Sequence, residues 1–447
     1  MACPGDLRRT PFNEQTTMSD TPFRQQRTLF AIILPFVLLA AHMLPGVLPA
    51  AGDTLYVTLR QADSLFLNRN FQLLAAEMQV EATRALEIQA RLYPNPVLTA
   101  DVNAVDPENG RAFHVGATGQ KAFQFEQLIL LGGKRRAEID LARTQVAIAE
   151  LALQDLLRRL KFRLHTELAE IGQSQALLRR YNDQLALLDT IMDAYAVQVE
   201  KGNLPLRDLV RLRSVYLNLN NDRAELLNTF YESQAHVQTL LQTQDFIVFL
   251  YADSDIGTYV RRNTLETLRT EALASHPHLL MMRQNQAFAR QYFDYQRRLA
   301  IPDVSLFSTY DQRGGAFNNQ INLGLAVPLP VWNRNQGHIQ HAQYQLLQTN
   351  YAYEALQQEI LSNLQNHYAR YMQTVAEYER TASLYNDDFE TTLRGMSDNF
   401  QKRNISLIEF VDFFESYNLA VAELARIKTQ LVTSAELLNL SIGKDLY

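Results

Sequence analysis

Residues 301–342 read IPDVSLFSTYDQRGGAFNNQINLGLAVPLPVWNRNQGHIQHA. Two stretches of alternating polarity flank a Gly-Gly turn, and such alternation predicts two half-buried strands joined as a hairpin. One face would carry Val304, Leu306, Ser308 and Tyr310 with Ile321, Leu323, Leu325 and Val327, and the other would carry Asn322, Gly324 and Ala326. A hairpin with these two faces suits either a membrane barrel wall or a soluble sheet, and alone it leaves both interpretations open.

The same order of elements is predicted twice along the chain: a helix, two strands, a very long helix and a return helix. In the first round, we predict a helix over Leu55–Leu92, strands within 97–127, a helix from Lys134 to the break at KGNLP, and a helix from Leu206 to about Gln244. In the second round, we predict a helix over about Leu265–Leu299, strands within 303–327, a helix from about Asn335 to Lys402, and a last helix that ends at about Leu440. A loop over about 245–263 separates the rounds. We therefore predict a tandem duplication, with repeats at 52–263 and 264–447.

The spacing of apolar residues supports this interpretation. A shift of 200 residues places Lys134 on Arg334 and Ala142 on Ala342, and a shift of 201 places EKGNLPLRDLV on QKRNISLIEFV. From Ala142 to Leu160 apolar side chains recur in steps of four and three, the heptad rhythm of coiled coils. A helix of roughly 65 residues would span about 100 Å. The sequence therefore predicts long coiled-coil hairpins rather than an ordinary helical bundle.

Charge, cysteine content and the N-terminus restrict the class of protein. The net charge of −6 argues against a nucleic-acid partner. Arg24 and Arg27 precede an apolar run that ends at small residues, so residues 1–51 are predicted to be a cleaved signal peptide, with an uncleaved anchor as the alternative. The single cysteine, Cys3, lies in this segment. A mature chain without cysteine has no disulfide, thiolate metal site or lipid-modified cysteine.

Four strands per chain are too few to close a barrel. An open sheet edge in lipid leaves backbone groups unpaired, and the smallest known membrane barrels have about eight strands. Partner chains would have to complete the barrel, and three copies would supply about twelve strands. These arguments leave a dimer and a trimer open.

Four motif regions carry a resemblance to a known family: LYPNP with VLTADVN, FEQLILLGGKRRAEIDLA, VPLPVWNRNQGHIQHA, and the paired breaks KGNLPLRDL and KRNISLIEF. With the duplicated architecture, they make the chain similar to the TolC-like outer-membrane efflux proteins. The form PLPVWNRNQGHI is most similar to the heavy-metal-resistance (cobalt–zinc–cadmium) branch. The resemblance implies a mainly α protein with a small β part. It implies a homotrimer whose twelve-stranded β-barrel, four strands per chain, lies in outer-membrane lipid and continues as a periplasmic α-helical barrel.

The resemblance also implies a function and partners. The chain would be the non-enzymatic exit duct of a tripartite efflux system, passively conducting substrates that include heavy-metal cations, and it would need no cofactor. It would work with a periplasmic adaptor protein and an inner-membrane transporter, usually proton-driven. The alternatives are the duct of a type I protein secretion or drug efflux system, and a non-conducting coiled-coil surface protein.

The breaks between long and return helices are the predicted functional sites. By resemblance, the turns at the periplasmic tip dock the adaptor, and they comprise Gly202, Asn203, Leu204 and Pro205 with Arg403, Asn404, Ile405 and Ser406. Just beyond them, Glu409 and Asp412 share one helical face. Three copies would crowd six carboxylates, raise the pKa of some of them and attract cations. Asp208 and Arg211 occupy the first-half positions, so a carboxylate–guanidinium network is expected to close the tip. Ordinary helix ends and a solvated helix face are the alternatives.

Other chemical motifs are weaker. His338 and His341 have a spacing that could ligate a metal, but no third ligand accompanies them, and no metal site is predicted. Trp332, Tyr310 and Phe317 flank the second hairpin and could form an interfacial aromatic girdle or pack in a core.

Overall fold

The computed structural model describes residues 53–314, 316–384 and 387–446. The predicted signal peptide, residues 1–51, lies outside these ranges. Thr54–Tyr447 form one compact unit, and the description below concerns this unit alone.

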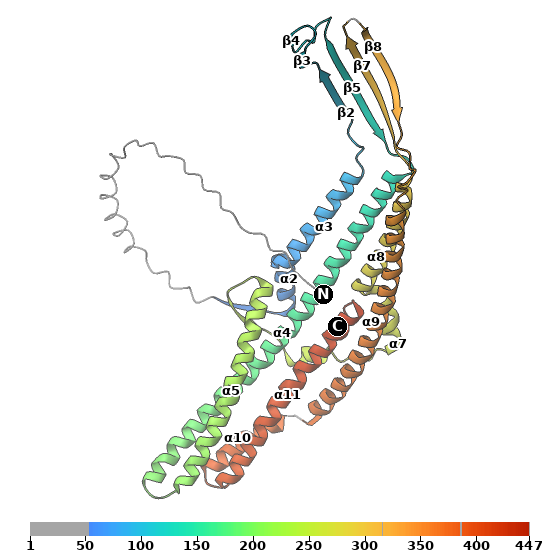
Figure 1. Ribbon diagram of the computed structural model, residues 1–447. Coiled ribbons are helices and arrows are strands. Elements are labelled where there is room, and N and C mark those ends of the chain that lie inside the picture. Colours follow the sequence, from blue (N-terminus) through green and yellow to red (C-terminus); the bar gives the residue numbers. More distant parts are fainter. Residues whose placement is uncertain (1–52, 315, 385–386, 447) are drawn as a thin grey trace, which may run out of the picture. The chain divides into compact units, whose positions relative to one another are not determined.

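The unit is mainly helical, with one four-stranded sheet (Figure 1). Its first half contains β1 Thr54–Val57, α2 Leu59–Arg69, α3 Phe71–Ala90, β2 Val97–Val102, β3 Val105–Asp106, β4 Arg111–Ala112, β5 Gln120–Ile129, α4 Lys134–Glu200 and α5 Leu206–Leu241. Its second half contains β6 Phe246–Phe249, α6 Asp253–Gly257, α7 Leu265–Ser275, α8 Pro277–Leu299, β7 Val304–Arg313, β8 Phe317–Ala326, α9 Gln336–Leu384, α10 Asp387–Gln401 and α11 Leu407–Ile442. The 67 residues of α4 make it about 100 Å long.

The first helix of each round differs from the prediction, because each is broken into two. At Asn70 and His276 the backbone is extended, with φ −66°, ψ 113° and φ −65°, ψ 114°. The Asn70 side chain accepts hydrogen bonds from the backbone N–H groups of Gln72 and Leu73, so it caps α3. The residue before a proline disfavours helical backbone, which explains the break before Pro277. The predicted Leu55–Leu92 helix is also wrong at its start, where β1 lies.

The predicted loop at about 245–263 contains regular structure. Its strand β6 pairs in parallel with β1, with Leu55 opposite Ile247 and Val57 opposite Phe249. Val57 and Ile247 are buried among residues of α2, α4 and α5. The first strand of the unit and the segment between the two halves therefore close over the same core.

The main sheet is antiparallel, with strand order β2-β5-β7-β8. Its register places Leu306 opposite Leu325, Ser308 opposite Leu323 and Tyr310 opposite Ile321, so these side chains share one face. Strands β2 and β5 do not form a simple hairpin, because the short β3–β4 ladder lies between them. Among the described residues, β2 and β8 each have one neighbouring strand in this sheet.

The helices pack in an order that matches the sheet. Contacts join α3 to α4, α4 to α8, and α8 to α9, which are the helices that flank β2, β5, β7 and β8 in the chain. Further along, α4 packs on α5 and α11 around a core that includes Leu188, Leu212, Phe410 and Phe414. In the predicted heptad stripe of α4, Leu153, Leu156 and Leu160 are half-buried against a second core, which includes Phe66 of α2 and Phe230 of α5. No helix in the described part of the chain is long and apolar enough to cross a membrane.

Candidate functional site

The first predicted tip is the turn between α4 and α5. Gly202 has φ +73°, the left-handed conformation that glycine adopts at low cost. Its N–H donates to the Val199 carbonyl at 3.0 Å, and the Asn203 N–H donates to the Gln198 carbonyl at 2.9 Å. The Asn203 side chain also donates to the Gln198 side chain at 2.8 Å. These bonds form a Schellman motif, which satisfies carbonyl groups that the end of α4 leaves free.

The second tip, between α10 and α11, repeats this arrangement with a different residue. Arg403 has φ +60° at the position of Gly202. Its N–H donates to the Phe400 carbonyl at 3.0 Å, and the Asn404 N–H donates to the Asn399 carbonyl at 2.8 Å. The Asn404 side chain donates to the Asn399 side chain at 3.0 Å. A residue with a Cβ therefore adopts the left-handed conformation here, at a cost of about 1 kcal/mol.

The helices that leave the two tips begin differently. Pro205 precedes α5 without a capping side chain. Ser406 forms a capping box with Glu409: the Glu409 N–H donates to Ser406 Oγ at 3.3 Å, and the Ser406 N–H donates to Glu409 Oε2 at 2.7 Å. The hydrogen bond from the Ser406 backbone lowers the pKa of the Glu409 carboxyl. The pattern Ser-x-x-Glu was visible in the sequence, and its capping role was missed.

The remaining predicted gate residues lie on exposed or half-buried helix faces near the tips. Arg211 and Asp412 are exposed, and Asp208 is half-buried beside Arg207, 3.5 Å away. Within the part of the chain that the structure describes, no ion pair joins Arg211 to Asp208, Glu409 or Asp412. The network expected from the sequence would therefore need contacts between copies, and it stays a prediction.

Aromatic side chains connect the two tips, and the sequence prediction missed them. Tyr195 of α4 stacks on Phe400 of α10 with centroids 5.7 Å apart, and Phe400 stacks on Phe410 of α11 at 4.4 Å. Burial and then the Asp208 carboxylate raise the pKa of the Tyr195 hydroxyl, whereas Arg403 acts in the opposite direction. A groove of about 580 Å³ runs along these residues. Tyr195 thus lies where charged groups from both tips approach each other.

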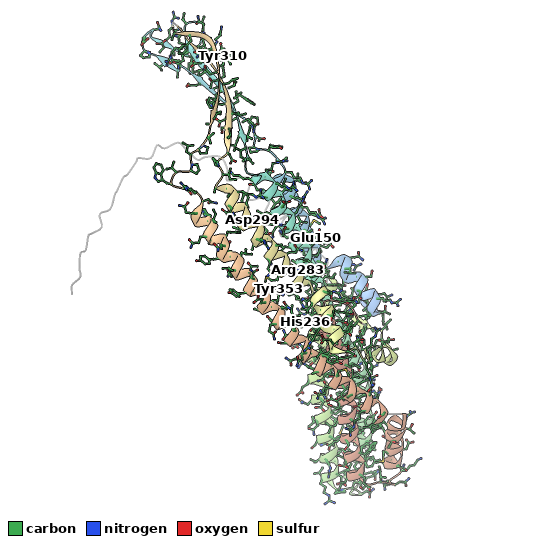
Figure 2. The ribbon with its side chains drawn as sticks, turned by 90° about the vertical axis from the view of Figure 1, so that its right-hand side faces the viewer. Glu150, His236, Arg283, Asp294, Tyr310 and Tyr353 are labelled. Atoms are coloured by element: carbon green, nitrogen blue, oxygen red, sulfur yellow. The ribbon has the colours of Figure 1, made fainter. Side chains whose placement is uncertain are left out.

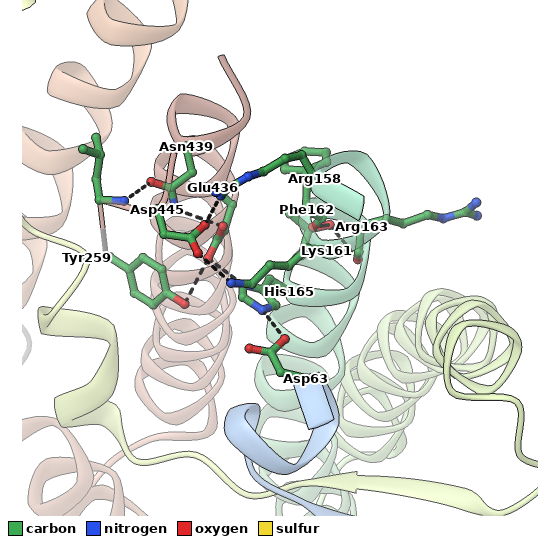
Figure 3. Close-up of polar contacts among 12 residues, drawn as sticks. Asp63, Arg158, Lys161, Phe162, Arg163, His165, Tyr259, Glu436, Asn439 and Asp445 are labelled. Atoms are coloured by element: carbon green, nitrogen blue, oxygen red, sulfur yellow. Dashed lines mark hydrogen bonds and ion pairs between the residues drawn. The ribbon is translucent and has the colours of Figure 1, made fainter. Parts of the chain in front are cut away.

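A second polar cluster lies near the other end of α11 (Figure 3). His165 of α4 is 6% exposed, and its two ring nitrogens lie 2.8 Å from Asp63 of α2 and 2.8 Å from Glu436 of α11. Burial alone would lower the pKa of His165, but the two carboxylates outweigh burial and raise the pKa to about 9. The imidazole is therefore charged at neutral pH, and it joins three helices.

Further contacts surround this triad. Glu436 also accepts from the Asn439 side chain at 3.1 Å and from the Tyr259 hydroxyl at 3.5 Å. Asp445, near the C-terminus, pairs with Arg158 and with Lys161, whose Nζ lies 2.9 Å away. A cavity of about 530 Å³ lies beside this cluster, and its lining includes Asp63, Lys161, His165, Tyr259 and Glu436. Nothing in the local sequence pattern around His165 indicated the cluster.

The weaker candidates from the sequence are surface groups in one chain. His338 and His341 are exposed, and the described residues include no cluster of three or more His, Cys, Asp or Glu that could hold a metal ion. Trp332 is 88% exposed. Tyr310 lies in the sheet (Figure 2), where its hydroxyl donates to Asn319 at 2.6 Å.

Comparisons with known proteins agree with this fold. Residues 268–444 match the outer membrane efflux protein family. The cobalt-zinc-cadmium resistance protein CzcC of Cupriavidus metallidurans is 25% identical over 293 residues, which are 66% of this chain and 67% of that protein. The structure of CusC superposes with a TM-score of 0.70 at 16% identity, covering 87% of this chain and 92% of that chain. VceC from Vibrio cholerae superposes with a TM-score of 0.66 at 14% identity, covering 87% and 97%.

These matches confirm the resemblance that the sequence motifs predicted. The likeness to the solved structures concerns the fold, a long helical region with a small sheet. The matched family and fold are those of efflux channels, which are conduits and not enzymes.

Proposed function

We propose that this chain, an outer membrane efflux protein, is the outer-membrane exit duct of a tripartite efflux system. The observation that carries the proposal is that one chain combines an antiparallel sheet with two different faces and very long helices such as α4. Helices of this length suit the wall of a tunnel that continues from the sheet. A duct of this kind conducts passively, and the energy comes from an inner-membrane transporter. A periplasmic adaptor would connect the two.

The assembled duct is proposed to be a homotrimer. One chain contributes four strands to the main sheet, and its outer strands β2 and β8 each have an edge to offer to another copy. Lipid does not tolerate open edges, so closure needs further strands. Three copies would give a twelve-stranded barrel in the outer membrane, with the apolar face toward lipid and the helices in the periplasm. The division into repeats at 52–263 and 264–447 is part of this proposal.

The two tips are proposed to dock the adaptor and to close the duct at rest. Both turns expose their outer residues, including Gly202, Asn203, Arg403 and Asn404. The capping role of Glu409 in one chain does not remove its charge, because its pKa is lowered. Glu409 and Asp412 of three copies would then form an acidic ring that favours cations, with Asp208, Arg211 and Tyr195 beside it.

Heavy-metal cations are the proposed substrates. The support is the sequence likeness to CzcC, a cobalt-zinc-cadmium resistance protein. A drug efflux or type I secretion duct is the second candidate, because an outer-membrane duct does not itself choose the substrate.

Conductance measurement tests the proposal. The purified protein in planar bilayers should give single-channel steps, and Glu409→Ala/Asp412→Ala should enlarge the conductance by opening the acidic ring. Glu423→Ala, on the same helix but paired with Arg426 farther from the tip, is the matched control and should conduct as the wild type does. A protein that assembles yet never gives conductance steps would instead be a structural coiled-coil protein.

A further inference from the structure

The connection between β2 and β5, residues 103–119, exposes apolar side chains, and we call this segment the outer loop. It contains the β3–β4 ladder, which Figure 1 shows at the end of the main sheet away from the helices. Val105 is 70% exposed, Phe113 69% and Val115 39%. Phe113 also has φ +48°, a left-handed conformation that a bulky residue rarely adopts. A strained and exposed aromatic residue of this kind points to a function.

We propose that the outer loop binds the lipid surface of the outer membrane, with Phe113 and Val105 inserted at the boundary between headgroups and acyl chains. The proposal rests on the proposed function, because it takes the apolar face of the main sheet to contact lipid. Its new content is a second contact with the membrane, made by a loop outside the four strands of that sheet.

The outer loop has a polar core of its own. Asp106 and His114 are 8% and 7% exposed, and Asp106 Oδ2 lies 2.6 Å from His114 Nδ1. The other ring nitrogen of His114 lies 3.0 Å from the Thr118 hydroxyl. Asp106 also accepts hydrogen bonds from the backbone N–H groups of Glu108 and Asn109, each at 3.1 Å. The loop therefore satisfies these polar groups internally and keeps its apolar side chains on the outside.

A second set of contacts fixes the outer loop to β7. The Gln312 side chain is 7% exposed, and its Nε2 donates to the carbonyl groups of Gly116 at 3.1 Å and Ala117 at 3.0 Å. A Cβ at Gly314 would lie 1.9 Å from the Thr118 carbonyl oxygen. Glycine therefore allows the loop to approach the end of β7 this closely.

Gln312 also decides which face of the sheet the outer loop lies against. It follows Tyr310 by two residues in β7, so the two side chains share a face. The Tyr310 hydroxyl donates to Gln312 Oε1 at 3.4 Å, which agrees with this placement. The same face carries Leu306 and Leu323, whereas Asn322 lies on the other. The loop thus adjoins the apolar face, which is the face proposed to contact lipid.

The position of the outer loop along the strands corresponds to a membrane interface. On the apolar face of β5, Phe125 and Phe123 are followed by Lys121. The ring of Phe123 lies 6.2 Å from that of Tyr310, and Lys121 lies opposite Gln312. Aromatic and then basic side chains mark the passage from acyl chains to headgroups. Strands β5 and β7 have ten residues each, the length that crosses a bilayer. The loop is therefore held at the level of the headgroups.

Tryptophan fluorescence in lipid vesicles tests the proposal. Trp332→Phe first removes the only tryptophan of the chain. Phe113→Trp in the full-length protein, reconstituted into phosphatidylcholine vesicles, should lose most of its emission when the lipid carries bromine near the glycerol end of its acyl chains. It should lose less when the bromine lies near the methyl end, because the loop is inserted only at the interface.

Two further positions in the same background are the matched controls. Leu323→Trp replaces a side chain that is 84% exposed on the apolar face in the middle of the sheet, and it should be quenched more strongly by bromine near the methyl end. Glu108→Trp lies in the polar turn of the β3–β4 ladder and should keep most of its emission with either lipid.

The outcomes separate the outer loop from the duct. Quenching of Leu323→Trp without quenching of Phe113→Trp overturns the loop contact and keeps the sheet in the membrane. Blue-shifted but unquenched emission from Phe113→Trp means contact with protein, such as a second copy, and also overturns it. Equal quenching of Phe113→Trp and Glu108→Trp overturns the assignment of Phe113. If Leu323→Trp is not quenched by either lipid, the proposed function itself is overturned.

Removal of the Gln312 side chain tests the attachment of the loop. With Gln312→Ala, the quenching of Phe113→Trp should fall at least twofold, because the loop is no longer held at the interface, while that of Leu323→Trp stays unchanged. Gln320→Ala is the matched control, since this exposed glutamine bonds to Asn322 on the polar face. Equal quenching of Phe113→Trp with Gln312 and with Ala overturns the role of Gln312.

Discussion

The two ends of α11 are stabilised by different kinds of contact, one exposed to solvent and one buried. At its N-terminal end, Ser406 and Glu409 are exposed, and a capping box holds the tip. Near its C-terminal end, the side chain of Glu436 is 8% exposed. Glu436 and Asp63 both form ion pairs with the ring of His165. Exposed ion pairs contribute little to the free energy of unfolding, because water solvates their charges well. Removing one partner of a buried charge destabilises the fold strongly, because the remaining charge is left unpaired away from water. The N-terminal end of α11 is thus held by exposed hydrogen bonds, and its C-terminal end by buried charged contacts.

The largest expected effect is the loss of Glu436. Glu436→Gln should lower the free energy of unfolding by about 3 kcal/mol, because it leaves the buried His165 charge with only the partly exposed Asp63. Urea unfolding followed by circular dichroism at pH 7 measures the change. Glu423→Gln removes an exposed pair with Arg426 on the same helix and should cost less than 1 kcal/mol. Equal losses of unfolding free energy in the two variants would contradict the prediction that buried and exposed contacts of α11 differ in strength.

The next largest effect is the pH dependence of the stability that the His165 cluster contributes. The pKa of His165 is raised from 6.5 to about 9, so its stabilisation is fully present below pH 6.5 and is lost as the pH rises through about 9. The loss should be on the order of 3 kcal/mol. Unfolding measured at pH 6, 8 and 10 should show the wild type converging on His165→Gln. A difference between them that stays constant over this range would contradict the prediction.

Removal of the cap at the tip should have a smaller effect. Ser406→Ala should lower the free energy of unfolding by about 1 kcal/mol. Because the pKa of Glu409 is lowered, the effect should be present at neutral pH and shrink as the pH falls through that lowered value. Thr58→Ala removes a capping box whose partner, Gln61, does not titrate, so its effect should not depend on pH in this way. Identical pH profiles would show that Glu409 is not coupled to the cap.

The left-handed turn residues give the smallest effect. Gly202→Ala should destabilise the first tip by about 1 kcal/mol, and Arg403→Gly should stabilise the second tip by up to about 1 kcal/mol. The gain is reduced because glycine is more flexible in the unfolded chain. Thermal unfolding of the two variants compares them directly. Effects of the same sign in both variants would mean that the two turns are not equivalent.

Local pattern predicted much of the fold. The alternation in residues 303–327 matches β7 and β8 within a residue at each end, and the long helix predicted from Lys134 is α4. The sequence prediction missed the breaks at Asn70 and His276. Both had a visible signal, because asparagine is a common helix-capping residue and Pro277 directly follows His276. Helical periodicity continues across such short breaks, so it concealed them.

Features that depend only on neighbouring residues in the chain could be predicted from the sequence. These are the two-faced strands, the heptad helices, the turns at Gly202 and Arg403, and the family motifs. Contacts between distant segments became known only from the folded chain, because no local pattern specifies which segments meet. His165 lies 102 residues from Asp63 and 271 from Glu436, and its charged state depends on both. The pairing of β5 with β7 is of the same kind, because it joins strands that are more than 170 residues apart in the chain, as Ile129 and Val304 are.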